Sequence, residues 1–170
     1  MRRPPHEGGR GRTVADGDHV SVLSAVKAYA AGVKRTPSPR NISVLVVDDE
    51  EPVRRFVERV MREAGYTTAV AADGAEAIQV AATLDPFDVV ITDVMMPRMS
   101  GDELARRLRA SRPSLKVLYL TGFSDRLFKD KVTLWEDEAF LDKPCSINGL
   151  LEAVSLLTFG RCNAPDESRS

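Results

Sequence analysis

The sequence predicts an α/β fold in which helices cover both faces of a five-stranded, doubly wound parallel sheet. Strand-like and helix-like segments alternate five times after Ile42. The strand-like segments are short apolar runs rich in β-branched residues, which is typical of strands buried on both faces. Strict alternation of the two patterns favours parallel strands joined by right-handed crossovers.

The elements can be assigned from these periodicities in chain order. We expect strands at Ser43–Val47, Thr67–Ala71, Val89–Thr92, Lys116–Leu120 and Ala139–Leu141. Helices are expected after each strand, at about Glu51–Ala64, Asp73–Leu84, Gly101–Ala110, Ser124–Leu134 and Ser146–Thr158. Gly65 and Gly160 stand where the first and last helices should end, because glycine readily adopts the left-handed conformation that closes a helix.

Charge divides the chain into a basic leader and an acidic body. Residues 1–40 carry eight Lys and Arg against three Asp and Glu, whereas residues 41–160 carry fourteen against twenty. The leader has few bulky apolar residues, so we expect residues 1–40 to be disordered. Helical spacing of apolar residues at 20–33 predicts a short helix there, either marginal or a docking segment, followed by a linker. The folded domain is expected at 41–159, with a disordered tail at 160–170.

Several classes of protein are disfavoured by composition. The chain lacks the roughly 18 consecutive apolar residues of a membrane span and the apolar stretch of a secretory signal, so we expect a cytoplasmic protein without membrane contacts. Cys145 and Cys162 have no metal-binding spacing and are expected to be free thiols. Nucleic-acid binding is not expected, because the folded part is acidic and no second helical module is evident.

Polar residues gather where the predicted strands end. Because the carboxyl ends of parallel strands share one edge of the sheet, where α/β folds bind their ligands, we expect these side chains to converge. The residues are Asp48, Asp49, Asp93, Thr121 and Lys143.

This set of side chains indicates phosphoryl chemistry on a metal. Three crowded carboxylates repel one another unless a hard cation holds them, and oxygen ligands suit Mg²⁺. We assign Asp49 and Asp93 as direct ligands and Asp48 as a ligand through water. Asp93 is the candidate nucleophile toward phosphorus, with Lys143 and Thr121 as donors to the phosphoryl oxygens.

Each residue also has a structural interpretation when it is taken alone. Asp48 and Asp49 could cap the following helix, Lys143 could form an ordinary salt bridge, and Thr121 could belong to a turn. Their joint occurrence at the correct strand ends favours the functional interpretation.

Four motifs together resemble the receiver domain of two-component response regulators, the CheY-like family. They are Val46-Val47-Asp48-Asp49-Glu50, Ile91-Thr92-Asp93-Val94-Met95-Met96-Pro97, Leu120-Thr121-Gly122 and Leu141-Asp142-Lys143-Pro144. The resemblance covers about residues 41–159. It implies a flavodoxin-like (βα)5 domain with strand order 2-1-3-4-5.

The resemblance also implies a signalling reaction. Asp93 would accept a phosphoryl group from a phosphohistidine of a sensor histidine kinase or a histidine phosphotransfer protein. Mg²⁺ would be held by Asp48, Asp49, Asp93 and the backbone carbonyl of Met95, and Lys143 and Thr121 would assist.

Further roles at five positions are implied by the same resemblance. Thr121 and Phe140 would be the switch residues that respond to the phosphoryl group, and Pro144 would follow a cis peptide bond. Met95 and Phe123 would flank the route of an attacking water, so two apolar side chains there predict a long-lived acyl phosphate.

Output is expected through another protein. Residues 160–170 are too few to form an effector domain, so we expect a stand-alone receiver, monomeric or dimeric on phosphorylation, that contacts a downstream target protein. It would not be an enzyme beyond its own phosphorylation and dephosphorylation. A phosphorylation-independent interaction module stays as the alternative. A phosphatase acting on small substrates is disfavoured, because Met95 stands where such enzymes carry a second Asp.

Overall fold

In the computed structural model, five strands form a single parallel sheet in the order β2-β1-β3-β4-β5, which confirms the predicted fold class. The structure describes residues 26–27, 42–84, 86–122 and 137–160. The strands are β1 (Ser43–Val47), β2 (Thr67–Ala71), β3 (Val89–Asp93), β4 (Lys116–Thr121) and β5 (Glu138–Asp142).

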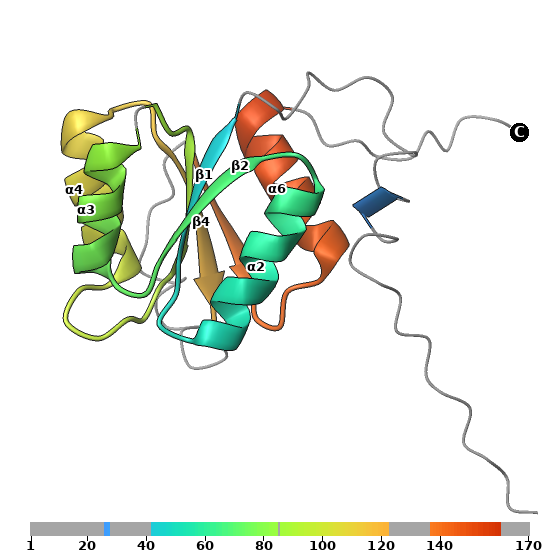
Figure 1. Ribbon diagram of the computed structural model, residues 1–170, viewed down its shortest axis with the longest axis horizontal. Helices are drawn as coiled ribbons and strands as arrows, with labels where there is room; N and C mark the ends of the chain where they lie inside the picture. Colours follow the sequence, from blue (N-terminus) through green and yellow to red (C-terminus); the bar gives the residue numbers. More distant parts are fainter. Residues whose placement is uncertain (1–25, 28–41, 85, 123–136, 161–170) are drawn as a thin grey trace, which may run out of the picture.

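Helices cover the sheet on both faces (Figure 1). On one face lie α2 (Glu51–Glu63) and α6 (Ile147–Phe159), and on the other lie α3 (Gly74–Thr83) and α4 (Gly101–Ser111). The helix predicted at 124–134 lies outside the described residues.

The core consists of two apolar clusters separated by the sheet, and consecutive strand residues alternate between them. Strand residues that pack toward α2 and α6 include Val44, Val46, Ile91, Leu118 and Leu120. Those that pack toward α3 and α4 include Leu45, Val47, Val90, Val117 and Tyr119. Burial on both sides explains why the strands are nearly continuous apolar runs.

The helix ends follow from local hydrogen bonding and backbone conformation. The Asp73 side chain accepts hydrogen bonds from the amides of Ala75 and Glu76, so Asp73 caps α3 rather than opening it. Ser146 caps α6 in the same way, by accepting from the Gly149 amide. Gly160, with φ of 64°, ends α6 as predicted.

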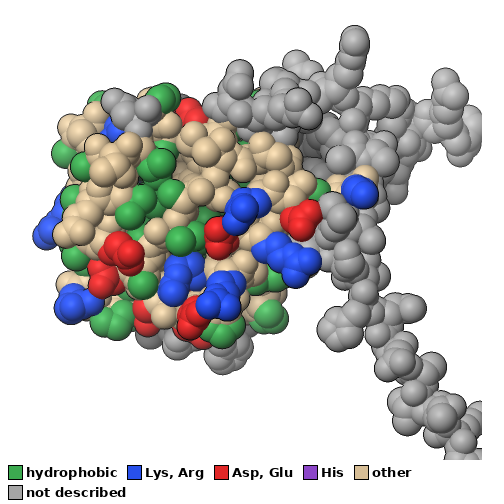
Figure 2. Space-filling model, viewed as in Figure 1, with side chains coloured by type: hydrophobic (Ala, Val, Ile, Leu, Met, Phe, Trp, Pro, Cys, Tyr) green, Lys and Arg blue, Asp and Glu red, His purple; other side chains and the backbone are tan. Residues whose placement is uncertain are grey.

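Charged side chains of both signs alternate on the outer face of α2 (Figure 2). They form i,i+4 ion pairs such as Glu51–Arg55 and Glu58–Arg62. Such exposed pairs stabilise a helix by only a few tenths of a kcal/mol each, on the order of 0.3 to 0.5. This face is therefore a solvated surface, while the opposite face of α2 packs on the sheet.

Three strands are longer at their carboxyl ends than the sequence pattern predicts. Asp93 pairs with Leu120 as the last residue of β3, and Thr121 pairs with Asp142 as the last residues of β4 and β5. The predicted ends were one residue short, because the parallel ladder continues into the polar residues. Backbone pairing therefore fixes the polar residues in place.

Only two residues of the leader are described. Val26 and Lys27 are helical, and Val26 is buried among the core residues on the side of α2 and α6. The remaining predictions for residues 1–40 and for 161–170 lie outside the described residues, and the domain limits stay predictions. Within the described part of the chain, none of the helices combines the length and apolarity needed to cross a membrane.

Candidate functional site

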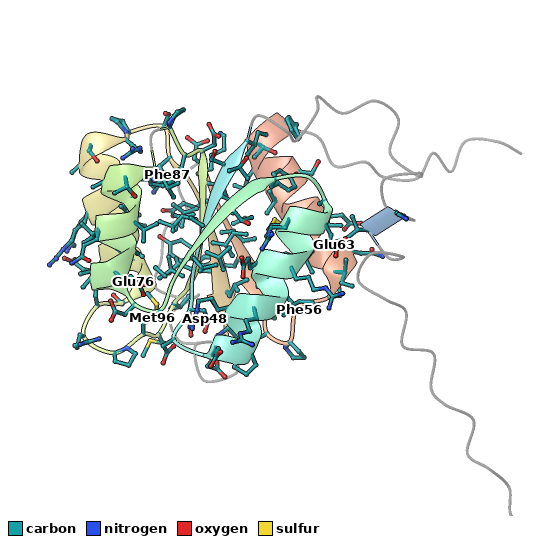
Figure 3. The ribbon with its side chains drawn as sticks, in the orientation of Figure 1. Asp48, Phe56, Glu63, Glu76, Phe87 and Met96 are labelled. Carbon is teal, nitrogen blue, oxygen red and sulfur yellow. The ribbon has the colours of Figure 1, made fainter. Side chains whose placement is uncertain are left out.

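Three carboxylates meet at the carboxyl edge of the sheet. One carboxylate oxygen each of Asp48, Asp49 and Asp93 can be chosen so that all three lie within 4.8 Å of one another. The pairing of Val47 with Thr92 in β1 and β3 brings Asp48 beside Asp93. In Figure 3, Asp48 lies at the lower end of the sheet, with Phe87 at the opposite end. Asp48 and Asp93 are buried, whereas Asp49 is exposed.

Lys143, the residue directly after β5, joins these acids. Its ammonium nitrogen lies 2.9 Å from Asp48 Oδ2, 3.0 Å from Asp93 Oδ2 and 3.2 Å from Glu50 Oε1. The Lys143 amide donates to the Thr121 carbonyl at 2.8 Å, which continues the ladder beyond the last paired residues. The peptide bond to Pro144 is cis, as predicted.

Burial and charge act in opposite directions on this ion cluster. Burial raises the pKa of Asp48, and this outweighs the lowering by Lys143 and by the Glu50 amide. Burial lowers the pKa of Lys143, but its close interactions with the carboxylates of Asp48 and Asp93 more than compensate, so that the pKa lies above its usual value. Lys143 therefore stays protonated at neutral pH, and the neighbouring Asp48 side chain loses its proton less readily than an ordinary aspartate.

The donor set fits a hard divalent cation. Oδ1 of Asp48 accepts the Glu50 amide at 2.9 Å. Oδ2 is fully buried and makes no hydrogen bond of acceptable geometry, although the Lys143 ammonium lies near it. A buried carboxylate oxygen without a hydrogen bond, beside two further carboxylates, suits Mg²⁺, which prefers oxygen ligands. Asp48 is the most buried of the three acids. Its assignment as a ligand through water stays a prediction.

Met95 lies at the rim of this site. Its backbone amide donates to Asp93 Oδ1 at 3.1 Å, and its side chain is 60% exposed. This contact orients the carboxylate of Asp93. The proposed ligand is the Met95 carbonyl, and that assignment stays a prediction.

The alternative role of the two N-terminal acids as caps of α2 is not supported. Glu50 occupies the cap position of α2, and no side chain caps that helix. The Asp48 side chain accepts from the amide of Glu50, which lies before the helix rather than inside it. The Asp48 side chain thus contacts the Glu50 amide directly after β1 and the Lys143 ammonium, and it does not cap α2.

Thr121 is buried at the end of β4. The hydroxyl donates to Asp142 Oδ1 at 2.8 Å. Phe140 is half-buried, and its ring stacks on Tyr119 with centroids 5.0 Å apart. Both predicted switch residues therefore make specific contacts in this structure.

Sequence reasoning missed four residues around the site. Arg54 donates to the Asp48 carbonyl at 2.6 Å, Glu50 contacts Lys143, and Asp142 accepts from Thr121. Gly101 opens α4 against Asp93: its amide donates to the Val94 carbonyl, and a Cβ at Gly101 would collide with the Asp93 carbonyl oxygen. Glu50 and Asp142 stood inside the quoted motifs and Gly101 at the expected start of a helix, whereas Arg54 had no usable signal.

The sequence model of the response regulator receiver domain matches residues 44–155. The chain belongs to this family. The receiver domain is 34% identical to the sensor kinase CckA of Brucella abortus, over 71% of this chain and 13% of CckA. It is 32% identical to the response regulator receiver protein CpdR of the same organism, over 65% of this chain and 92% of CpdR.

Solved structures agree with the family assignment. The chemotaxis protein CheY4 of Vibrio cholerae superimposes on the receiver domain with a TM-score of 0.62 at 32% identity, covering 68% of this chain and 98% of CheY4. The match confirms the CheY-like fold that the sequence motifs implied. Among curated relatives the receiver domain spans nearly all of CpdR and a small part of CckA.

Proposed function

We propose that this receiver domain is the phosphoacceptor of a two-component or phosphorelay system and that Asp93 accepts the phosphoryl group. The supporting observation is the group of Asp48, Asp49 and Asp93 within 4.8 Å, with the Lys143 ammonium in direct contact with Asp48 and Asp93. The donor would be a phosphohistidine of a sensor histidine kinase or a histidine phosphotransfer protein. Similarity to the sensor kinase CckA supports this class of partner.

The transfer exchanges one bond to phosphorus for another. A carboxylate oxygen of Asp93 attacks phosphorus, an O–P bond forms, and the N–P bond to the partner's histidine breaks with its electron pair leaving on the ring nitrogen. Mg²⁺ held by Asp48, Asp49, Asp93 and the Met95 carbonyl would neutralise the phosphoryl oxygens. Lys143 donates to one phosphoryl oxygen from its place between the acids.

The signal would leave the site through Thr121 and Phe140. Thr121 donates its hydroxyl to a phosphoryl oxygen, and the volume it vacates allows the Phe140 ring to change its packing against Tyr119. The altered surface would contact a downstream target protein in the cytoplasm, as a monomer or as a phosphorylation-dependent dimer. The chain would act as a switch without turnover of other substrates.

Incubation with acetyl phosphate and Mg²⁺, followed by intact-mass measurement, tests this proposal. We expect one phosphoryl group per chain, lost in Asp93→Asn and in the presence of a chelator. Asp102→Asn, which removes an acid at the start of α4, is the matched control and should be labelled like wild type. Absence of label in wild type would contradict the proposal and favour a phosphorylation-independent interaction module, and continuous turnover would indicate an enzyme.

A pull-down then identifies partners of the phosphorylated form. Wild type and Asp93→Ala are compared after the same treatment with acetyl phosphate and Mg²⁺. Target proteins that depend on phosphorylation should be retained by wild type alone.

A further inference from the structure

We propose that Asp142 restrains Thr121 in the unphosphorylated protein and thereby sets how readily the site accepts a phosphoryl group. This inference rests on the proposed function, because it concerns the same site. It assigns Asp142 a positioning role that acts through Thr121.

The contact is built into the sheet. Thr121 and Asp142 are paired neighbours at the last position of β4 and β5. The Thr121 side chain is fully buried, and its hydroxyl donates to Asp142 Oδ1 at 2.8 Å. The next backbone hydrogen bond, from the Lys143 amide to the Thr121 carbonyl, is also 2.8 Å long and holds the two strand ends together.

A threonine hydroxyl carries a single proton and can make one strong donation at a time. In this structure the proton is given to the carboxylate of Asp142. A phosphoryl oxygen on Asp93 would compete for the same proton, so donation to the phosphoryl group requires the contact with Asp142 to break. Because both acceptors are anionic, the exchange replaces one charge-assisted hydrogen bond by another.

The strand register places Thr121 next to the residue that pairs with Asp93. Asp93 pairs with Leu120, the residue before Thr121, and the Val94 amide donates to the Leu120 carbonyl at 3.1 Å. Thr121 therefore stands one position beyond the partner of Asp93 on the neighbouring strand. In the proposed competition, the Thr121 hydroxyl would turn from Asp142 toward a phosphoryl oxygen on Asp93.

The last residue of β5, Asp142, and the residue that follows it, Lys143, thus have opposite effects on the proposed reaction. Lys143 contacts Asp93 and favours an incoming anion, whereas Asp142 engages the donor that the anion needs. Removing Asp142 should therefore strengthen binding of a phosphoryl group, while removing Lys143 should weaken it.

Binding of beryllofluoride, a phosphoryl mimic, in the presence of Mg²⁺ tests the inference when it is followed by fluorine NMR on the full chain. We expect Asp142→Ala to bind it about tenfold more tightly, which corresponds to about 1.4 kcal/mol. Asp142→Asn keeps an uncharged acceptor and should give a smaller gain. Glu152→Gln removes one negative charge from an exposed position on α6 and should bind like wild type.

A double-mutant cycle separates the hydrogen bond from simple charge repulsion. In a Thr121→Val background, Asp142→Ala should have no effect, because there is no hydroxyl left to release. An equal gain in both backgrounds would overturn the inference, since Asp142 would then act only through its charge. Unchanged or weaker binding in Asp142→Ala alone would also overturn it.

The proposed function and this inference fail in different ways. Wild type that binds beryllofluoride, with an Asp142→Ala variant that binds no better, leaves the phosphoacceptor function intact and removes the role of Asp142. Wild type that does not bind it at all removes both.

Discussion

The Lys143 ammonium lies 3.0 Å from Asp93 Oδ2, although 50 residues separate them in the chain. The same nitrogen lies 2.9 Å from the fully buried Asp48. Under the proposed function, the lysine would therefore meet both the incoming cation and the incoming phosphoryl group. Removal of the Lys143 ammonium should strengthen the binding of Mg²⁺ and weaken the binding of a phosphoryl group.

Replacement of Lys143 by Met should strengthen Mg²⁺ binding while slowing phosphorylation. The ammonium repels a divalent cation, so we expect Mg²⁺ to bind at least about threefold more tightly to Lys143→Met, as measured by calorimetry. Labelling by acetyl phosphate should fall, because a donor to the phosphoryl oxygens is lost. Lys116→Met, which removes the ammonium paired with Asp137 near the start of β4, is the control. Weaker Mg²⁺ binding in Lys143→Met would contradict the assigned geometry.

As the pH is lowered, Mg²⁺ affinity should begin to fall at a higher pH than it would if Asp48 had the pKa of an ordinary aspartate. Burial raises the pKa of Asp48 above the usual 3.8, and the cation requires the ionised form. Mg²⁺ affinity should therefore be greatest above the raised pKa of Asp48 and should fall as the pH drops through that pKa. Calorimetry across acidic pH measures this, and constant affinity down to pH 3.8 would exclude it.

The same shift predicts how the metal-free protein responds to pH. The folded state holds the Asp48 proton more tightly than the unfolded chain does. Protonated Asp48 therefore adds to the free energy of unfolding at pH values below 3.8, and this contribution is lost as the pH rises through the raised pKa. Chemical unfolding of Asp48→Asn should lack this component. A pH profile identical to that of wild type would argue against the assignment to Asp48.

A methyl group at Gly101 should be far more damaging than one at Gly74. At Gly101 the new Cβ would collide with the backbone carbonyl of Asp93, whereas at Gly74 it would meet the flexible side chain of Met99. We expect Gly101→Ala to lose about 1 to 3 kcal/mol of unfolding free energy and to be labelled more slowly. Gly74→Ala should lose less than about 1 kcal/mol. Urea unfolding compares them, and equal losses would refute the close approach of α4 to β3.

The exposed Met95 side chain should protect the acyl phosphate from water. Met95→Gln keeps a similar shape but adds polar atoms that can orient an attacking water, so the half-life of phosphorylated Asp93 should fall by about tenfold. Loss of radioactive label from the purified protein measures it. Leu156→Gln changes the other exposed large apolar residue among those described, near the end of α6, and should leave the half-life unaltered. Phe123, the second residue of this prediction, lies outside the described residues.

Local sequence patterns determined the element order, the parallel sheet and the identity of the acidic site. Strand-like apolar runs and helix-like periodic segments are local signals that alternate along the chain. A polar residue at the end of a strand-like run marks the carboxyl edge of the parallel sheet before any contact is known. Asp48, Asp93 and Lys143 could be grouped on that basis alone. Strand ends were predicted one residue short, because ladder pairing with a neighbouring strand extends β3 to Asp93 and β4 to Thr121.

Only the tertiary structure decided which polar groups bond to one another. The contact of Thr121 with Asp142 depends on the register between β4 and β5, and that of Arg54 with the Asp48 carbonyl depends on how α2 leaves β1. Likewise, the raised pKa of Asp48 arises from burial by distant parts of the chain. Register, helix orientation and desolvation are set by packing between segments far apart in sequence, so no local pattern encodes them.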